Sequence, residues 1–170
     1  PATPPTNAAG EVASGASAFD MLKDVSFLIF IIISMAAPGM QRFYFLGTAQ
    51  FMQDNGIASK NVPAAMAIAQ ATQALATLFV LGWLVEHAGY KWTLTIGAAS
   101  WLILFTIYVL PRPAGVIAAS QAFHGLAYVF FIIAGQMFAG AVAPKGAEAS
   151  MQALIFTAQS GIALFLGTQL

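Results

Sequence analysis

Five long apolar segments, separated by short polar turns, run through most of this sequence. The first, residues 25–52, is long enough as a helix to cross the roughly 30 Å hydrocarbon core of a bilayer. The other four are residues 63–85, 92–110, 114–142 and 149–170. Lipid offers the backbone no hydrogen-bond partners, and the period-two alternation of a membrane barrel is missing. The pattern therefore predicts an all-α, polytopic transmembrane helix bundle of about five spans.

The composition agrees with a lipid environment. Hydrophobic residues make up 59% of the chain and charged residues 7%, whereas soluble proteins carry about 25% charged residues. Six basic and six acidic residues give no net charge and no basic cluster, which argues against a nucleic-acid partner. With no cysteine, disulfides and thiolate chemistry are excluded. We expect the lipid bilayer as a partner, and neither a cofactor nor a metal.

The first 23 residues differ in kind from the rest. Residues 1–23 are rich in Pro, Ala, Gly, Ser and Thr, and cannot bury enough apolar surface to fold alone. We predict a linker there and a transmembrane domain over residues 24–170. The chain begins with Pro1, and its fifth apolar segment reaches Leu170 without a polar exit. We therefore expect further helices in the complete protein.

Polar side chains recur at helical spacing on three of the spans. They are Gln41, Tyr44 and Thr48; Gln70, Gln73 and Thr77; and Gln121, His124 and Tyr128. Counted from the span ends, the three groups converge on one depth near the middle of the membrane. We predict that Gln41, Tyr44, Gln70, Gln73, His124 and Tyr128 line half of a cavity. Amides, phenols and an imidazole suit a neutral solute with several hydrogen-bonding groups and a flat ring, such as a nucleoside or a sugar.

Each of these residues also has a purely structural interpretation. Intramembrane Gln, Thr and Tyr can hold helices together through interhelical hydrogen bonds. His124 is a candidate for proton coupling because imidazole titrates near physiological pH, and it could equally be a neutral core residue. Arg42 is the charged residue closest to mid-membrane, and either takes part in coupling or extends its guanidinium toward the interface.

The sequence contains no enzyme motif. Glu86-His87 lacks the second histidine of a metalloprotease helix, and there is no phosphate-binding glycine loop. The acidic residues beyond residue 23 lie at span ends: Asp24, Asp54, Glu86 and Glu148. We therefore predict that the protein is not an enzyme.

The turn between the second and third spans is similar to a motif of the major facilitator superfamily, Gly-x-x-x-Asp/Glu-x-x-Gly-x-Lys/Arg. Here the motif residues are Gly82, Glu86, Gly89 and Lys91. We expect close helix crossing at Gly82, a turn at Gly89, and a charge pair between Glu86 and Lys91. The resemblance implies that this is a cytoplasmic gating turn, that the spans are helices seven to eleven of a twelve-helix carrier, and that residues 1–23 join its halves. It also implies a missing amino-terminal half and a multi-pass location, for which we expect the bacterial inner membrane.

Three blocks narrow the resemblance to the nucleoside:proton symporter family. They are residues 43–49 (FYFLGTA), 66–73 (MAIAQATQ) and 123–131 (FHGLAYVFF). The resemblance implies that Gln41 and Gln70 are binding glutamines and that Tyr128 holds an aromatic position. Gln73, Leu104 and Val129 stand where that family commonly has charged residues. The implied function is nucleoside transport by alternating access, of the proton-symport type. A carrier of a sugar or another neutral polar solute, or a non-transporting membrane receptor with the same fold, stays open.

Overall fold

The structure is a computed structural model that describes residues 20–163, 165 and 168. All regular secondary structure of these residues is helical, which confirms the predicted all-α class. Most of the predicted linker lies outside the described residues. Its last residues form a short 3-10 helix, η1 (Met21–Lys23).

The chain divides into two compact units, which are described separately. The first contains residues up to Arg42 and from Gln136 onward, and the second runs from Phe43 to Gly135. Helix α2 (Val25–Asp54) begins in the first unit and ends in the second. It is continuous through Pro38.

The first unit packs the start of α2 against the end of the chain. Its other helices are α6 (Ala134–Val142), which begins in the second unit, α7 (Glu148–Phe156) and the π-helix η5 (Thr157–Ala163). The Asp24 carboxylate accepts the backbone N–H of Phe27 at 2.9 Å, which satisfies a free donor in the first turn of α2. Phe27 packs with Met151 and Ile155 in a buried apolar core.

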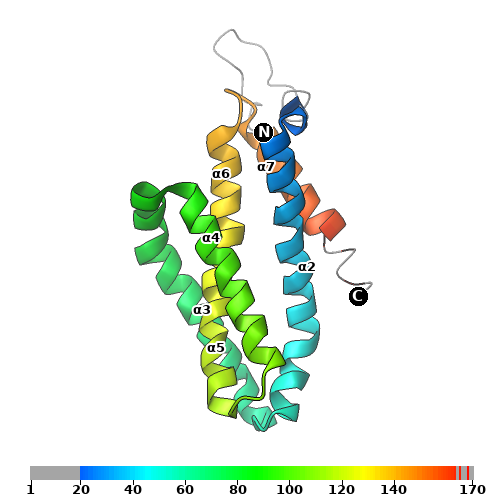
Figure 1. The fold of residues 1–170 in the computed structure, drawn as a ribbon, viewed down its shortest axis with the longest axis vertical. Helices are drawn as coiled ribbons and strands as arrows, with labels where there is room; N and C mark the ends of the chain where they lie inside the picture. Colours follow the sequence, from blue (N-terminus) through cyan, green and yellow to red (C-terminus); the bar gives the residue numbers. More distant parts are fainter. Residues whose placement is uncertain (1–19, 164, 166–167, 169–170) are drawn as a thin grey trace, which may run out of the picture. The chain divides into compact units, whose positions relative to one another are not determined.

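The second unit holds the helices that matter for the candidate site. They are α3 (Val62–Leu75), the π-helix η3 (Ala76–Leu81), α4 (Gly82–Val109), α5 (Ala114–Ala127) and the π-helix η4 (Tyr128–Ile133). Figure 1 shows α3, α4 and α5 side by side, and α5 contacts both of the others. A Cβ at Gly97 of α4 would lie 2.6 Å from backbone atoms of Phe130 and Phe131, so only glycine allows this approach.

Three helices of the described residues are long and apolar enough to cross a membrane, and they end at Asp54, Val109 and Val142. The middle one covers Ser59–Val109 and combines the second and third predicted spans. It is interrupted at Gly89, where φ is 75° and ψ is 169°. The predicted reversal between these spans is therefore confirmed. For the fifth predicted span, the structure describes α7 and η5, which together are shorter than the roughly 20 residues that a span needs.

The second unit exposes large apolar side chains and buries a polar one. Leu78 is 74% exposed and Val109 is 82% exposed, whereas Gln121 is completely buried. Soluble proteins bury most of their large apolar side chains and leave amides in water. This inverted arrangement suits a lipid surrounding, where exposed apolar side chains cost nothing and polar ones seek partners inside.

Candidate functional site

A cluster of aromatic and polar side chains fills the centre of the second unit. Tyr44 of α2 and His124 of α5 are each 2% exposed, and their rings stack with centroids 3.8 Å apart at an angle of 6°. The Tyr44 hydroxyl donates to Gln121 Oε1 at 2.6 Å. Gln121 Nε2 donates to the Tyr108 hydroxyl at 2.8 Å and to the Ile117 carbonyl at 3.0 Å. The amide of Gln121 thus ties α2, α4 and α5 together.

His124 is enclosed by rings. The indole of Trp101 meets it edge-on at 5.1 Å, and Phe45 meets it edge-on at 5.8 Å. Two buried nitrogens here, His124 Nδ1 and Trp101 Nε1, have no hydrogen-bond partner among the described residues. We call Tyr44, Trp101, Tyr108, Gln121 and His124 the aromatic cluster. Buried polar atoms are nearly always paired, so its two unpaired nitrogens call for an explanation.

Glycine brings α3 against α5 beside this cluster. A Cβ at Gly125 would lie 2.4 Å from the Ala69 carbonyl oxygen and 2.9 Å from the Gln73 backbone nitrogen. No larger residue fits without moving the helices apart. The residue that follows His124 therefore touches the backbone of the helix that carries Gln70 and Gln73.

The other predicted binding residues of the second unit are more exposed than Tyr44 and His124. Gln70 is exposed, and Gln73 and Tyr128 are half-buried. Within the described residues, no hydrogen bond is recorded for any of these three side chains. Their side chains are therefore more exposed than those of Tyr44 and His124, which the helices of their own unit cover. This burial differs from the single cavity surface that we predicted for all six residues, because flat rings stack well between closely packed helices.

Two predicted residues belong to the first unit. Gln41 is half-buried and Arg42 is exposed on α2. In the described residues, Arg42 forms no hydrogen bond or ion pair. The roles suggested for Gln41 in binding and for Arg42 in coupling stay predictions.

The predicted gating turn adopts the expected backbone conformation, but the other contacts predicted for it are not formed within the described residues. Gly89 adopts the positive φ expected of it. Glu86 and Lys91 are both exposed and do not pair, and the ion pair found in the described part of the chain joins Lys23 and Asp20. The charge pair was therefore wrong for this conformation, since both side chains lie in the open on either side of the turn. A Cβ built at Gly82 meets no described atom within 4 Å, so the close crossing expected there is not made with the described residues and stays a prediction.

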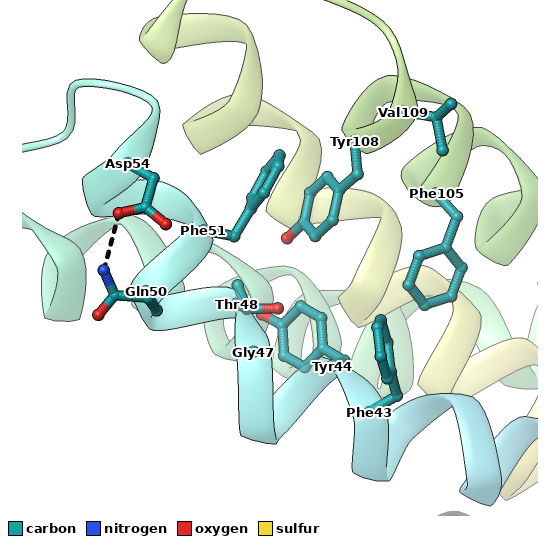
Figure 2. A pocket seen from close by; sticks show the side chains of 10 residues that line it. All are labelled: Phe43, Tyr44, Gly47, Thr48, Gln50, Phe51, Asp54, Phe105, Tyr108 and Val109. Atoms are coloured by element: carbon teal, nitrogen blue, oxygen red, sulfur yellow. Dashed lines mark hydrogen bonds between the residues drawn. The ribbon is translucent and has the colours of Figure 1, made fainter. Parts of the chain in front are cut away.

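A groove of about 430 Å³ opens between α2 and α4, beside the aromatic cluster. Figure 2 shows Phe51 beside Tyr108 in its wall, and Asp54 with Gln50 at one end. The rings of Phe51 and Tyr108 stack at 4.5 Å, and Gln50 Nε2 donates to the Asp54 carboxylate at 2.7 Å. Most of its lining is apolar or aromatic.

Sequence reasoning missed Tyr108 and Trp101. Aromatic residues near span ends are common at membrane interfaces, so the position of Tyr108 carried no distinctive signal. Gln121 was visible on the same helical stripe as His124, but the sequence could not show that its amide is saturated by partners.

Comparison with known proteins places this geometry in context. The family model described as Nucleoside H+ symporter matches residues 1–170. The crystal structure of a mutant of the nucleoside transporter NupG has a similar fold, with a TM-score of 0.77 and 23% sequence identity. The match covers 90% of this chain and 41% of that transporter, so the chain spans less than half of its length. Among curated proteins, none matches the chain.

Proposed function

Because this chain belongs to the nucleoside H+ symporter family, we propose that the complete protein carries nucleosides across the membrane together with protons. The family match over the whole chain is the observation that carries this proposal. The chain is part of an integral, multi-pass membrane protein. As part of a twelve-helix carrier, it supplies helices seven to eleven, and residues 1–23 connect them to the amino-terminal half. The two halves then rock about a central site to give alternating access.

In this proposal, the open residues of the second unit contact the solute. The free amides of Gln70 and Gln73 can each donate to and accept from ribose hydroxyls or the edge of a base. The half-buried ring of Tyr128 offers an apolar face to a flat base, and its hydroxyl offers a further hydrogen bond. The hydrogen bonds of the aromatic cluster connect α5 with α2 and α4. Gln41 is the candidate contact on α2.

The charge distribution supports a cytoplasmic location for the turn at Gly89. With the turn inside, Lys23, Lys91 and Lys145 are cytoplasmic, while Lys60 and Arg112 are outside. This excess of basic residues follows the positive-inside rule. We place the protein in the bacterial inner membrane, where a proton gradient can drive uptake.

The test is uptake of radiolabelled uridine and adenosine by cells that express the full-length gene, with empty-vector cells as the control. We expect uptake above the control that a proton uncoupler abolishes. Unlabelled hexoses should not compete with the nucleoside. Uptake that survives the uncoupler would contradict proton symport. No nucleoside uptake, or strong competition by a hexose, would contradict the proposed substrate class.

A further inference from the structure

We infer that His124 is the proton-binding site that couples proton movement to solute movement. This inference rests on the proposed function, and it deepens that function by assigning the proton to one atom, Nδ1. His124 Nδ1 is buried without a hydrogen-bond partner among the described residues. A histidine held only for packing would pair its nitrogens, because a buried polar atom without a partner costs about 1–3 kcal/mol.

Among the groups around this site, His124 is the one whose side chain ordinarily titrates nearest to neutral pH. Tyr44 of α2 stacks on His124, and the amide of Gln121 links Tyr44 to Tyr108 of α4. Both phenols ordinarily titrate near pH 10. From α4, Trp101 presents a ring that does not titrate. From α3, the nearest atoms at neighbouring Gly125 are backbone atoms of Ala69 and Gln73 and the Thr72 Cβ. The apolar parts of these spans contain no Asp or Glu.

The surroundings of His124 can accommodate its charged form. The imidazole lies flat on the ring of Tyr44 at 3.8 Å, and a cation above an aromatic face is stabilised by the electrons of that face. The hydrogen bond from the Tyr44 hydroxyl to Gln121 holds this ring in position. A proton arriving at Nδ1 therefore breaks no hydrogen bond of the described residues and meets a fixed aromatic surface.

The same position links the proton to the solute residues. Gly125, the residue after His124, touches the α3 backbone at Ala69 and Gln73. A charge gained at His124 therefore lies one residue from a close contact between α5 and the helix that carries Gln70 and Gln73. The proton comes from water on one side of the membrane, adds to Nδ1, and leaves from it to water on the other side. With the ring's own proton on Nε2, binding breaks an O–H bond of hydronium and forms the Nδ1–H bond, and release breaks that N–H bond and returns the proton to water.

The experiment compares His124→Gln with His87→Gln in the full-length protein. His87 is the other histidine of this chain, and its exposed ring stacks on Trp83 in the turn, so it serves as the matched control. Three quantities are measured: accumulation of nucleoside driven by a proton gradient, alkalinisation of the medium on nucleoside addition, and exchange of nucleoside at equal concentrations on both sides. Exchange requires a folded carrier but no net proton movement.

We expect His124→Gln to lose accumulation and alkalinisation while it keeps exchange, and His87→Gln to keep all three. Alkalinisation that persists in His124→Gln would overturn the inference and leave the proposed function intact. Wild-type protein without nucleoside uptake would instead overturn the proposed function.

A second variant decides the matter if His124→Gln also loses exchange. Tyr44→Leu removes the aromatic face beneath the imidazole and leaves His124 in place. If His124 carries the proton, the pH of half-maximal uptake should fall by about half a unit or more, because the charged form loses its stacking partner. An unchanged pH profile in Tyr44→Leu would overturn the inference.

Discussion

Gln121 and Gln70 both lie on polar stripes at a similar predicted depth, yet the structure treats them in opposite ways. Gln121 is fully buried and uses both ends of its amide in hydrogen bonds. Gln70 is exposed, with no hydrogen bond recorded in the described residues. An amide with its partners already in the bundle stabilises helix packing, and a free amide is available to a solute. The aromatic cluster and the exposed glutamine of α3 therefore differ in burial and in hydrogen bonding.

The largest expected effect comes from Gly125→Ala, which affects both regions at once. The new Cβ would lie 2.4 Å from the Ala69 carbonyl oxygen, so α3 and α5 must separate. We expect a loss of about 3 kcal/mol or more in the free energy of unfolding, measured as a lower Tm of the full-length protein in detergent. Gly115→Ala on the same helix is the control, since a Cβ there meets no described atom within 4 Å. Equal Tm values for Gly125→Ala and Gly115→Ala would contradict the close contact between α3 and α5.

Gln121→Leu should damage the aromatic cluster alone. The substitution keeps most of the side-chain volume but leaves the buried Tyr44 hydroxyl without its acceptor. We expect a loss of about 1–3 kcal/mol in the free energy of unfolding, seen as a lower Tm. Tyr44→Phe removes that hydroxyl, so adding it to Gln121→Leu should cost less than the sum of the two single changes. Additive losses would show that the hydrogen bond does not couple these residues.

Gln70→Ala should leave stability unchanged and weaken uptake. Its amide forms no hydrogen bond with the described residues, so we expect unchanged Tm and surface expression. If it contacts solute, uptake should weaken with a KM about 2–10 times higher, equivalent to one lost hydrogen bond. Gln73→Ala should act similarly. A drop in Tm matched by a drop in expression for both variants would instead place these glutamines in helix packing.

The smallest expected effect belongs to Tyr108→Phe. This change removes one acceptor from Gln121 Nε2, which still donates to the Ile117 carbonyl. We expect a loss of about 0.6 kcal/mol, typical of a side-chain hydrogen bond within a membrane protein. Tyr44→Phe should lower Tm more, because the Tyr44 hydroxyl is the partner recorded for Gln121 Oε1. If Tyr108→Phe lowered Tm more than Tyr44→Phe, the hydrogen bond of Tyr108 would contribute more to stability than that of Tyr44.

Much of the fold was predictable because lipid restricts a chain so strongly. Apolar length located the first four spans, and the glycine at position 89 marked the reversal that its positive φ confirms. The family was predictable from short blocks of residues, and the match over residues 1–170 confirms it.

The site was only partly predictable. Helical spacing identified Tyr44, Gln121 and His124 as polar residues on shared faces, but spacing alone does not reveal which face meets another helix and which meets open space. That distinction depends on how closely helices approach, which Gly125 decides. Tyr108 and Trp101 looked like ordinary aromatic residues of a span, and only tertiary contacts bring Trp101 to His124 and Tyr108 to Gln121.

The π-helix η3 has a consequence for comparing sequences by motif. Each residue of an α-helix advances about 100° around the axis, and a π turn holds about one residue more than an α turn. The segment after η3 is therefore out of angular phase with α3 by roughly one residue. Gly82 follows directly after this stretch. The direction in which it faces therefore cannot be found by extending the 100° spacing of α3 along the sequence. Motif spacing counted across η3 therefore does not predict which face of the helix a residue occupies.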